Sequence, residues 1–219
     1  MTDSAASAHD ALRAHAAATA TVDEALSSAR ADATEYGIAA PDAADGELLA
    51  MLTSLATVRA PGGAEGRGPA AIAITPAAGI VGLHVFAGMP VDGHLTCIDP
   101  DTEHQKLARS AFRAAGIGTG RYRFMPARPL QVMGRLAPGN YDFIYVDVPA
   151  DHVAAMREAA WPLLGPGGVL VIAGMTYGDG PTEAVAQAIA AADESFRELD
   201  DALLARVPLG RGAAVLRKL

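Results

Sequence analysis

Asp99 is a candidate residue for binding a nucleoside. The apolar run HLTCID at residues 94–99 is typical of a strand that ends in this residue, and a helix capped by Asp101 or Thr102 follows it. A carboxylate at the carboxyl end of a strand can accept hydrogen bonds from both hydroxyls of a ribose. Each bond to a charged acceptor contributes roughly 1.5–3 kcal/mol. The pattern predicts a ribose anchor at Asp99, and the alternative is that this side chain only caps or turns the chain.

Asp147 ends a second apolar run, YDFIYVD at residues 141–147. If this run is the fourth strand of a parallel sheet, Asp147 lies beside the point where strand order reverses and ligands bind. It could face a cofactor, bind a metal, or cap the next helix, and Pro149 and Asp151 keep the capping role open.

The stretch AIAITPAAGI at residues 71–80 has the position of a cofactor loop, since a short apolar run ends where a helix begins. Such loops use glycines where backbone must approach a ligand closely. Gly79 is the only glycine in the stretch, and Pro76 also removes one N–H donor.

Short apolar runs alternate with helical patterns from about residue 70 onward, which predicts an α/β fold with a mostly parallel sheet. Nearly continuous apolar strands indicate that both sheet faces are buried. The segment 202–219 contains two apolar runs joined by PLGRG, which predicts a closing antiparallel hairpin. We expect strands at 71–74, 94–99, 121–125, 141–147 and 168–174, and helices near 78–88, 101–115, 128–136, 151–163 and 182–192. GPGG at 165–168 reads as the turn before the fifth strand.

The first 60 residues read as a helical extension. Asp23 and Gly37 have the residue types expected at the start and end of one helix, and leucines at helical spacing predict another over 45–58. A Gly- and Pro-rich linker at 59–69 follows. The predicted division is an extension at 1–60 and the main domain at 61–219.

Bulk composition narrows the class of protein. A net charge of −8 and a pI near 5.1 argue against nucleic acid or an anionic membrane as a partner. Cys97 is the single cysteine, so an internal disulfide and a cysteine zinc cluster are excluded. No apolar run reaches about 18 residues, and the polar N-terminus lacks a signal pattern. We therefore expect a cytoplasmic protein.

From about Glu24 onward the chain resembles the bacterial O-methyltransferases related to catechol and caffeoyl-CoA O-methyltransferases, in a divergent actinobacterial branch. The order of the matching segments is more specific than any one of them. They are GLHVFAGM (82–89), LTCIDPDTEHQKLARSAFRAAGI (95–117), YDFIYVD (141–147), WPLLGPGGVLVI (161–172) and PLGRGAAVLRK (208–218).

This resemblance implies a Rossmann-like class I methyltransferase fold and transfer of a methyl group from S-adenosylmethionine to a small-molecule hydroxyl. It implies that the loop containing Thr75, Ala77 and Gly79 lies against the methionine part of the cofactor. It also implies a homodimer in which the N-terminal helices cover the acceptor. The remaining implied cofactor contacts are Asp99 at the ribose, Pro100, Ala127 and Arg128 around the adenine, and Asp147 near the sulfonium and amine.

The chain departs from the family pattern at its catalytic positions. Metal-dependent members use an Asp-Ala-Asp-Lys run and a later Asp-Asn pair, whereas Val148, Pro149 and Ala150 follow Asp147 here and the later pair is Gly-Met. A hard cation needs several oxygen ligands, so we expect no metal. We assign no catalytic residue. The side chains that follow the fourth and fifth strands and could act as a base are Asp151, His152, Tyr177 and Asp179, while His104 reads as a surface residue.

Two other functions compete with this interpretation. A non-catalytic relative would keep the fold while its cofactor loop degenerated, and would act as a regulatory or partner protein. A nicotinamide-dependent oxidoreductase would also use Asp99, but the chain lacks G-x-G-x-x-G and ends in a hairpin.

Overall fold

The computed structural model describes residues 2–58, 68–175, 182–208 and 210–219. Within these ranges the chain forms one seven-stranded sheet with the order β3-β2-β1-β4-β5-β7-β6. Strands β1 to β5 pair in parallel and β7 runs antiparallel to both neighbours, so the predicted closing hairpin is confirmed. The strands are β1 Ala70–Ile74, β2 His94–Ile98, β3 Tyr122–Met125, β4 Tyr141–Val146, β5 Leu164–Ala173, β6 Ala202–Val207 and β7 Ala213–Lys218.

The chain moves outward from β1 to β3 and then returns to the other side of β1 to form β4. The reversal therefore lies between β1 and β4, whose carboxyl ends meet near Ile74 and Val146. In open α/β sheets ligands bind outside the carboxyl ends of the strands at this point. Asp99 and Asp147 directly follow β2 and β4, so the fold brings both predicted residues to this edge.

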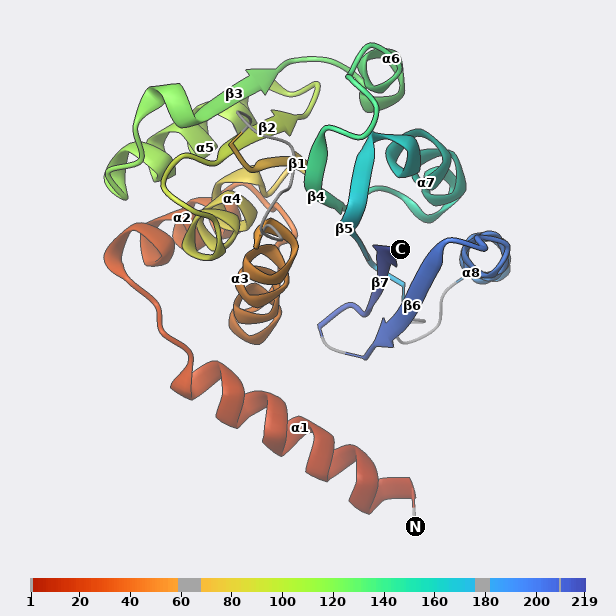
Figure 1. Cartoon of the computed structure of the whole chain (residues 1–219). Coiled ribbons are helices and arrows are strands. Elements are labelled where there is room, and N and C mark those ends of the chain that lie inside the picture. Colours follow the sequence, from red (N-terminus) through yellow and green to blue (C-terminus); the bar gives the residue numbers. More distant parts are fainter. Residues whose placement is uncertain (1, 59–67, 176–181, 209) are drawn as a thin grey trace.

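Alternating residues of the strands supply two separate hydrophobic cores. Ile72 and Ile144 pack with helices α7 and α8, while Ala73 and Tyr145 pack on the face covered by α3 and α4. Figure 1 shows these two helical layers on either side of the sheet. The prediction of a sheet buried on both faces is confirmed. The helices that follow β1 are α4 Ala78–Gly88, α5 Thr102–Ala114, α6 Pro129–Met133, α7 Val153–Ala160 and α8 Glu183–Arg197.

Three helices precede the sheet: α1 Thr2–Thr19, α2 Glu24–Glu35 and α3 Ala43–Thr57. Asp23 caps α2 by accepting the Leu26 N–H, and Gly37 follows the helix with a φ of 65°. Both predicted end signals of this helix are confirmed. Helix α1 projects away from the rest of the chain (Figure 1), and its contacts are chiefly with α3.

Several predicted boundaries differ from the structure. GPGG lies inside β5, whereas the sequence predicts a turn before this strand. Gly165 and Gly168 have no Cβ, so backbone carbonyl groups of neighbouring segments can approach them closely. A Cβ on Gly165 would lie 3.0 Å from the Gly139 carbonyl oxygen. The register between β4 and β5 shifts in this region. Helix α6 is shorter than predicted, α8 extends to Arg197, and 3-10 turns flank α7. Most of the predicted linker lies outside the described residues.

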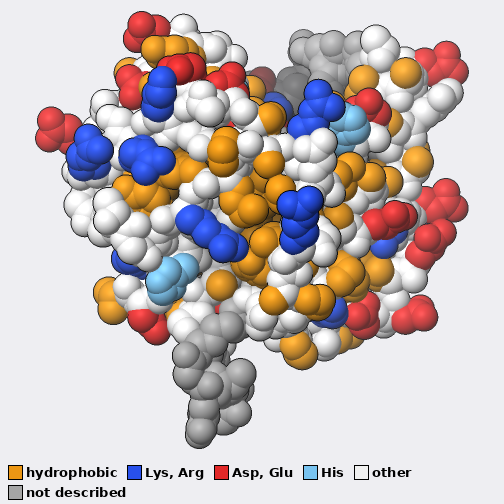
Figure 2. Space-filling model, turned by 90° about the horizontal axis from the view of Figure 1, so that it is seen from above, with side chains coloured by type: hydrophobic (Ala, Val, Ile, Leu, Met, Phe, Trp, Pro, Cys, Tyr) orange, Lys and Arg blue, Asp and Glu red, His pale blue; other side chains and the backbone are white. Residues whose placement is uncertain are grey.

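The surface seen from above the first view carries a central group of hydrophobic side chains (Figure 2). Basic side chains lie beside this group and acidic ones lie mainly toward the margins, so neither charge covers the face as a continuous patch. Among the described residues, none of the helices is both long and apolar enough to cross a membrane.

Candidate cofactor site

A cleft of about 730 Å³ lies at the carboxyl ends of β1, β2 and β4. This volume falls within the range of about 300–1,000 Å³ that is usual for small-molecule sites. Its apolar walls include Ile98, Leu130 and Met156. Five predicted cofactor residues line it together: Thr75, Asp99, Pro100, Arg128 and Asp147.

Asp99 is buried, and its position is fixed by the first turn of α5. One carboxylate oxygen accepts the Asp101 N–H at 2.7 Å, and the other lies 2.9 Å from Nδ1 of His104. The Asp99 carbonyl accepts from Nε2 of Gln105 at 2.8 Å. A carboxylate has about four acceptor sites. These two contacts therefore leave acceptor capacity for the two hydroxyls of a ribose.

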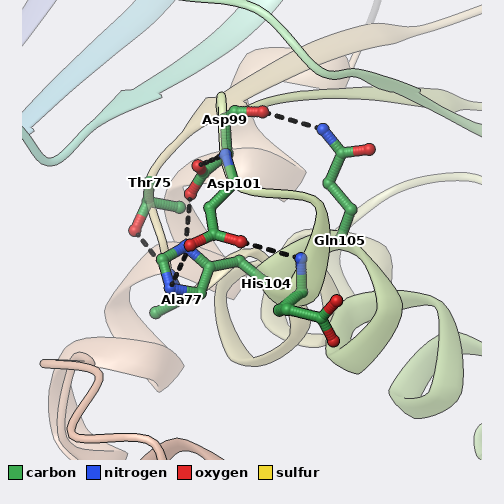
Figure 3. Close-up of polar contacts among 7 residues, drawn as sticks. Thr75, Ala77, Asp99, Asp101, His104 and Gln105 are labelled. Carbon is green, nitrogen blue, oxygen red and sulfur yellow. Dashed lines mark hydrogen bonds and ion pairs between the residues drawn. The ribbon is translucent and has the colours of Figure 1, made fainter.

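His104 reads as a surface residue in the sequence, and the structure shows it half-buried at the cleft. Its side chain is 24% exposed, lines the cleft, and lies between the carboxylates of Asp99 and Asp101, as Figure 3 shows. Its Nε2 is 3.8 Å from the Asp101 carboxylate. The position of His104 could be inferred from the sequence, because a helix capped by Asp101 has residue 104 in its first turn, close to the end of the preceding strand.

In the loop after β1, one backbone N–H group donates a hydrogen bond to a side chain of the same loop. The Ala77 N–H donates to Oγ1 of buried Thr75 at 3.1 Å (Figure 3), and Pro76 has no N–H. The loop consequently offers fewer backbone donors to a ligand than a loop of glycines would.

Three predicted cofactor residues do not line the cleft. Ala77 and Gly79 line a separate small pocket against α2 and α5. A Cβ on Gly79 would lie 3.2 Å from the Cα of Ala108, so this glycine allows α4 and α5 to pack closely. Ala127 packs against the hydrophobic core on the α7 face.

Asp147 extends the pairing of β4 with β1, because its N–H donates to the Ile74 carbonyl at 2.8 Å. Its side chain is 10% exposed, and one carboxylate oxygen lies 2.5 Å from Nη2 of Arg211. Arg211 lies in the connection between β6 and β7, 64 positions away in sequence. Burial, reinforced by the charge of Asp147, raises the pKa of the Tyr145 hydroxyl above its usual range.

A second pocket of about 170 Å³ lies on the Arg211 side, between α3 and the β6–β7 hairpin. Tyr145, Asp42 and Asp45 line it together with apolar side chains such as Leu49. The Asp147–Arg211 pair therefore connects the wall of the large cleft with the wall of this smaller pocket.

Two further expectations concern a metal centre and a base among the described residues. It contains no group of three or more His, Cys, Asp or Glu side chains placed to hold a metal ion. His152 lines the cleft but is 58% exposed, and its Nε2 is 4.0 Å from the Asp151 carboxylate. Tyr177 and Asp179 lie outside the described residues.

Comparisons with known proteins bear on this site. Residues 73–173 match the family model described as a methyltransferase domain. A Mycobacterium tuberculosis protein named "Probable O-methyltransferase" is 36% identical over 209 residues, which cover 93% of this chain and 88% of that protein.

Solved structures share this fold. A Corynebacterium glutamicum protein is 42% identical with a TM-score of 0.85, over 96% of this chain and 97% of that one. The O-methyltransferase TomG of Streptomyces achromogenes, involved in tomaymycin synthesis and solved with S-adenosylmethionine, has a TM-score of 0.76 at 22% identity, over 95% of this chain and 96% of that one. Because the similarity to the mycobacterial protein spans nearly the whole of both chains, this chain belongs to the O-methyltransferase family.

Proposed function

We propose that the protein transfers a methyl group from S-adenosylmethionine to the hydroxyl of a small molecule, without a divalent metal. The observation that carries the proposal is the cleft at the switch point of the sheet, with the Asp99 carboxylate preoriented on its wall. Family membership and the S-adenosylmethionine complex of TomG support the same cofactor.

The cleft wall fits the chemistry of this cofactor. Three carboxylates and the Arg128 guanidinium line it, and one of these carboxylates, Asp147, is paired with Arg211, so the formal charge of these groups together is −1 when the histidines are neutral. S-adenosylmethionine carries a net positive charge from its sulfonium and ammonium groups, which this wall would favour. The proposed arrangement places the ribose at Asp99, the adenine near Pro100 and Arg128, and the methionine end toward Thr75 and Asp147.

Bound cofactor supplies a methyl group made electrophilic by the sulfonium. The chain's own contribution is to orient the adenosine through Asp99 and to present apolar walls that exclude water. An acceptor hydroxyl held in line with this methyl group would take it and lose its proton, and the sulfur would keep the bonding electrons as a neutral thioether. Asp151 and His152 are the described candidates to receive this proton, and the proposal assigns it to neither.

Metal independence is proposed from the contacts of Asp147. Its carboxylate faces a guanidinium, and the three residues after it are Val148, Pro149 and Ala150, which bring no further carboxylate or lysine. A single engaged carboxylate does not provide the several oxygen ligands that magnesium requires.

Calorimetric titration with S-adenosylmethionine and S-adenosylhomocysteine, in magnesium and in EDTA, tests the proposal. We expect saturable binding of both ligands that EDTA does not change. Ligand at about 100 times its dissociation constant should add about 2.7 kcal/mol to the free energy of unfolding, which thermal melting detects. Absence of binding at millimolar ligand would favour the non-catalytic alternative, and binding only with magnesium would contradict metal independence.

We also propose a homodimer that uses the outer face of α3. Met51 and Leu55 lie one turn apart on this helix and are 55% and 66% exposed, and Val58, the extended residue directly after the helix, is 72% exposed. A clustered apolar stripe of this kind is typical of a protein interface. In this proposal residues 1–60 form the extension that supplies the dimer contacts, while the cytoplasmic location and the absence of a nucleic-acid partner stay predictions.

A further inference from the structure

The ion pair of Asp147 and Arg211 joins the end of β4 to the connection between β6 and β7, which is far from it in sequence. Asp147 is nearly buried at the end of β4, whereas the Arg211 side chain is 48% exposed. Asp147 belongs to the wall of the large cleft and Arg211 to that of the smaller pocket. A ligand that extends from the cleft toward α3 would therefore meet both charges in turn.

The backbone on both sides of Arg211 has an unusual conformation. Gly210 and Gly212 flank it with φ values of 50° and 72°, a conformation that residues with a Cβ rarely adopt. The same hairpin is already attached to α8 by a second pair, in which Arg206 Nε lies 2.6 Å from Asp193. Attachment of the hairpin therefore does not by itself account for Arg211.

The loop after β1 offers fewer backbone donors to a carboxylate than a loop of glycines would. Pro76 has no N–H, and the Ala77 N–H is bonded to Thr75. A guanidinium can replace missing backbone donors, because it presents paired N–H groups that match both oxygens of a carboxylate.

We infer that Arg211 binds the α-carboxylate at the amino acid end of the cofactor, beside the α-ammonium contact that the family resemblance already implies for Asp147. This inference rests on the proposed function. A zwitterion brings one charge of each sign, so its ammonium group would face Asp147 while its carboxylate faces Arg211. Asp147 would therefore keep an opposite charge beside it when the ligand binds, and leaving this nearly buried carboxylate unpaired would be strongly unfavourable.

Two ligands that differ only in the amino acid group provide the test. S-adenosylhomocysteine carries this group, and 5′-methylthioadenosine is the same nucleoside thioether without it. We expect the wild-type protein to bind the first about 10- to 100-fold more tightly by calorimetry, the range for charge-assisted hydrogen bonds. Arg211→Ala should reduce this preference to about 3-fold or less while its affinity for 5′-methylthioadenosine is unchanged.

Arg206→Ala is the matched control, since Arg206 lies in the same hairpin with a 54% exposed side chain and pairs with a carboxylate away from the cleft. It should preserve the wild-type preference. Arg211→Lys retains the charge and the fold but not the paired donors, so an intermediate preference is expected even if the alanine variant unfolds. Asp147→Asn should also lower the preference.

The outcomes separate the two proposals. If the wild-type protein binds neither ligand, the proposed function fails and this inference fails with it. If S-adenosylhomocysteine binds tightly and both Arg211 variants keep the full preference, the inference is overturned while the proposed function stands.

Discussion

At the residue scale, Asp99 illustrates how one carboxylate can serve the chain and a ligand together. It accepts one contact from the helix N-terminus and one from His104, and both hold it toward the cleft. His104 is thus a positioning residue for the proposed ribose anchor. The alternative role, in which Asp99 only caps or turns the chain, is compatible with ligand binding, because the contact with the Asp101 N–H orients the Asp99 carboxylate.

Asp99→Asn should weaken binding of S-adenosylhomocysteine about 10- to 100-fold, measured by calorimetry. The amide loses the charge that strengthens hydrogen bonds from ribose hydroxyls, worth roughly 1.5–3 kcal/mol. Asparagine can still accept the Asp101 N–H, so a purely capping Asp99 would leave the affinity unchanged. Asp92→Asn, at the exposed turn before β2, is the control and should have no effect.

A second prediction at this scale concerns His84 of α4, which is buried against Gly46 of α3. Within the described structure its Nε2 has no hydrogen-bond partner. Burial, assisted by the positive charge of Arg30, lowers its pKa to about 4 from an ordinary value of 6.5. The unfolded chain therefore binds more protons than the folded protein between these two values, and stability falls as the pH falls through this window.

His84→Leu removes this titration and should reduce the pH dependence. At pH 4.5 the wild-type protein should lose about 2 kcal/mol of unfolding free energy relative to pH 7 through His84 alone. The loss in the variant should be smaller by about that amount, as urea unfolding at the two pH values can show. Equal losses in both proteins would mean that His84 does not carry the effect.

At the element scale, glycines set the distance between the helices that cover one face of the sheet. A Cβ on Gly88 of α4 would lie 2.0 Å from the Ala50 carbonyl oxygen of α3, so the two backbones are in direct contact there. A Cβ on Gly82 would lie 2.3 Å from the Phe112 ring of α5. This close packing holds α3 beside the sheet edge that carries the cleft and the second pocket.

Gly88→Ala should destabilise the fold by about 1–3 kcal/mol, because a rigid backbone group cannot move aside for the added methyl. Gly134→Ala is the matched control, since nothing lies within 4 Å of a Cβ there and φ is −64°. Its unfolding free energy should be unchanged or raised by up to about 1 kcal/mol. Denaturant unfolding of both variants distinguishes a steric effect from the loss of glycine itself.

At the scale of the whole molecule, the outer face of α3 and the projecting α1 are surfaces that the described chain leaves exposed (Figure 1). An edge strand is the competing surface, because β6 forms one margin of the sheet and its Leu203 is 56% exposed. Substitutions on the two surfaces distinguish an interface at α3 from an interface at β6.

Leu55→Asp should convert the proposed dimer to a monomer in sedimentation velocity, because it places a charge in the centre of the α3 stripe. Leu203→Asp, a substitution of the same kind at a similarly exposed leucine, should leave the dimer intact. The opposite pattern would move the interface to the sheet edge, and a monomeric wild-type protein would refute the proposed dimer.

Local physical rules account for what could be predicted from the sequence alone. Nearly continuous apolar runs indicated the parallel strands, and Asp23 and Gly37 marked the ends of α2 because capping depends on neighbours only a few positions away. The strand–helix order predicted the sheet, and with it the placement of Asp99 and Asp147 at one edge.

The tertiary structure alone decided which partners these side chains have. Arg211 reaches Asp147 across 64 positions, and no short-range pattern encodes such a contact. Gly79 reads as a cofactor glycine in sequence, yet its missing side chain makes room for α5, and the glycines of GPGG serve close approach of backbone within β5. Side-chain type and spacing are properties of the sequence, whereas the neighbour that gives a residue its role is set by packing between distant segments.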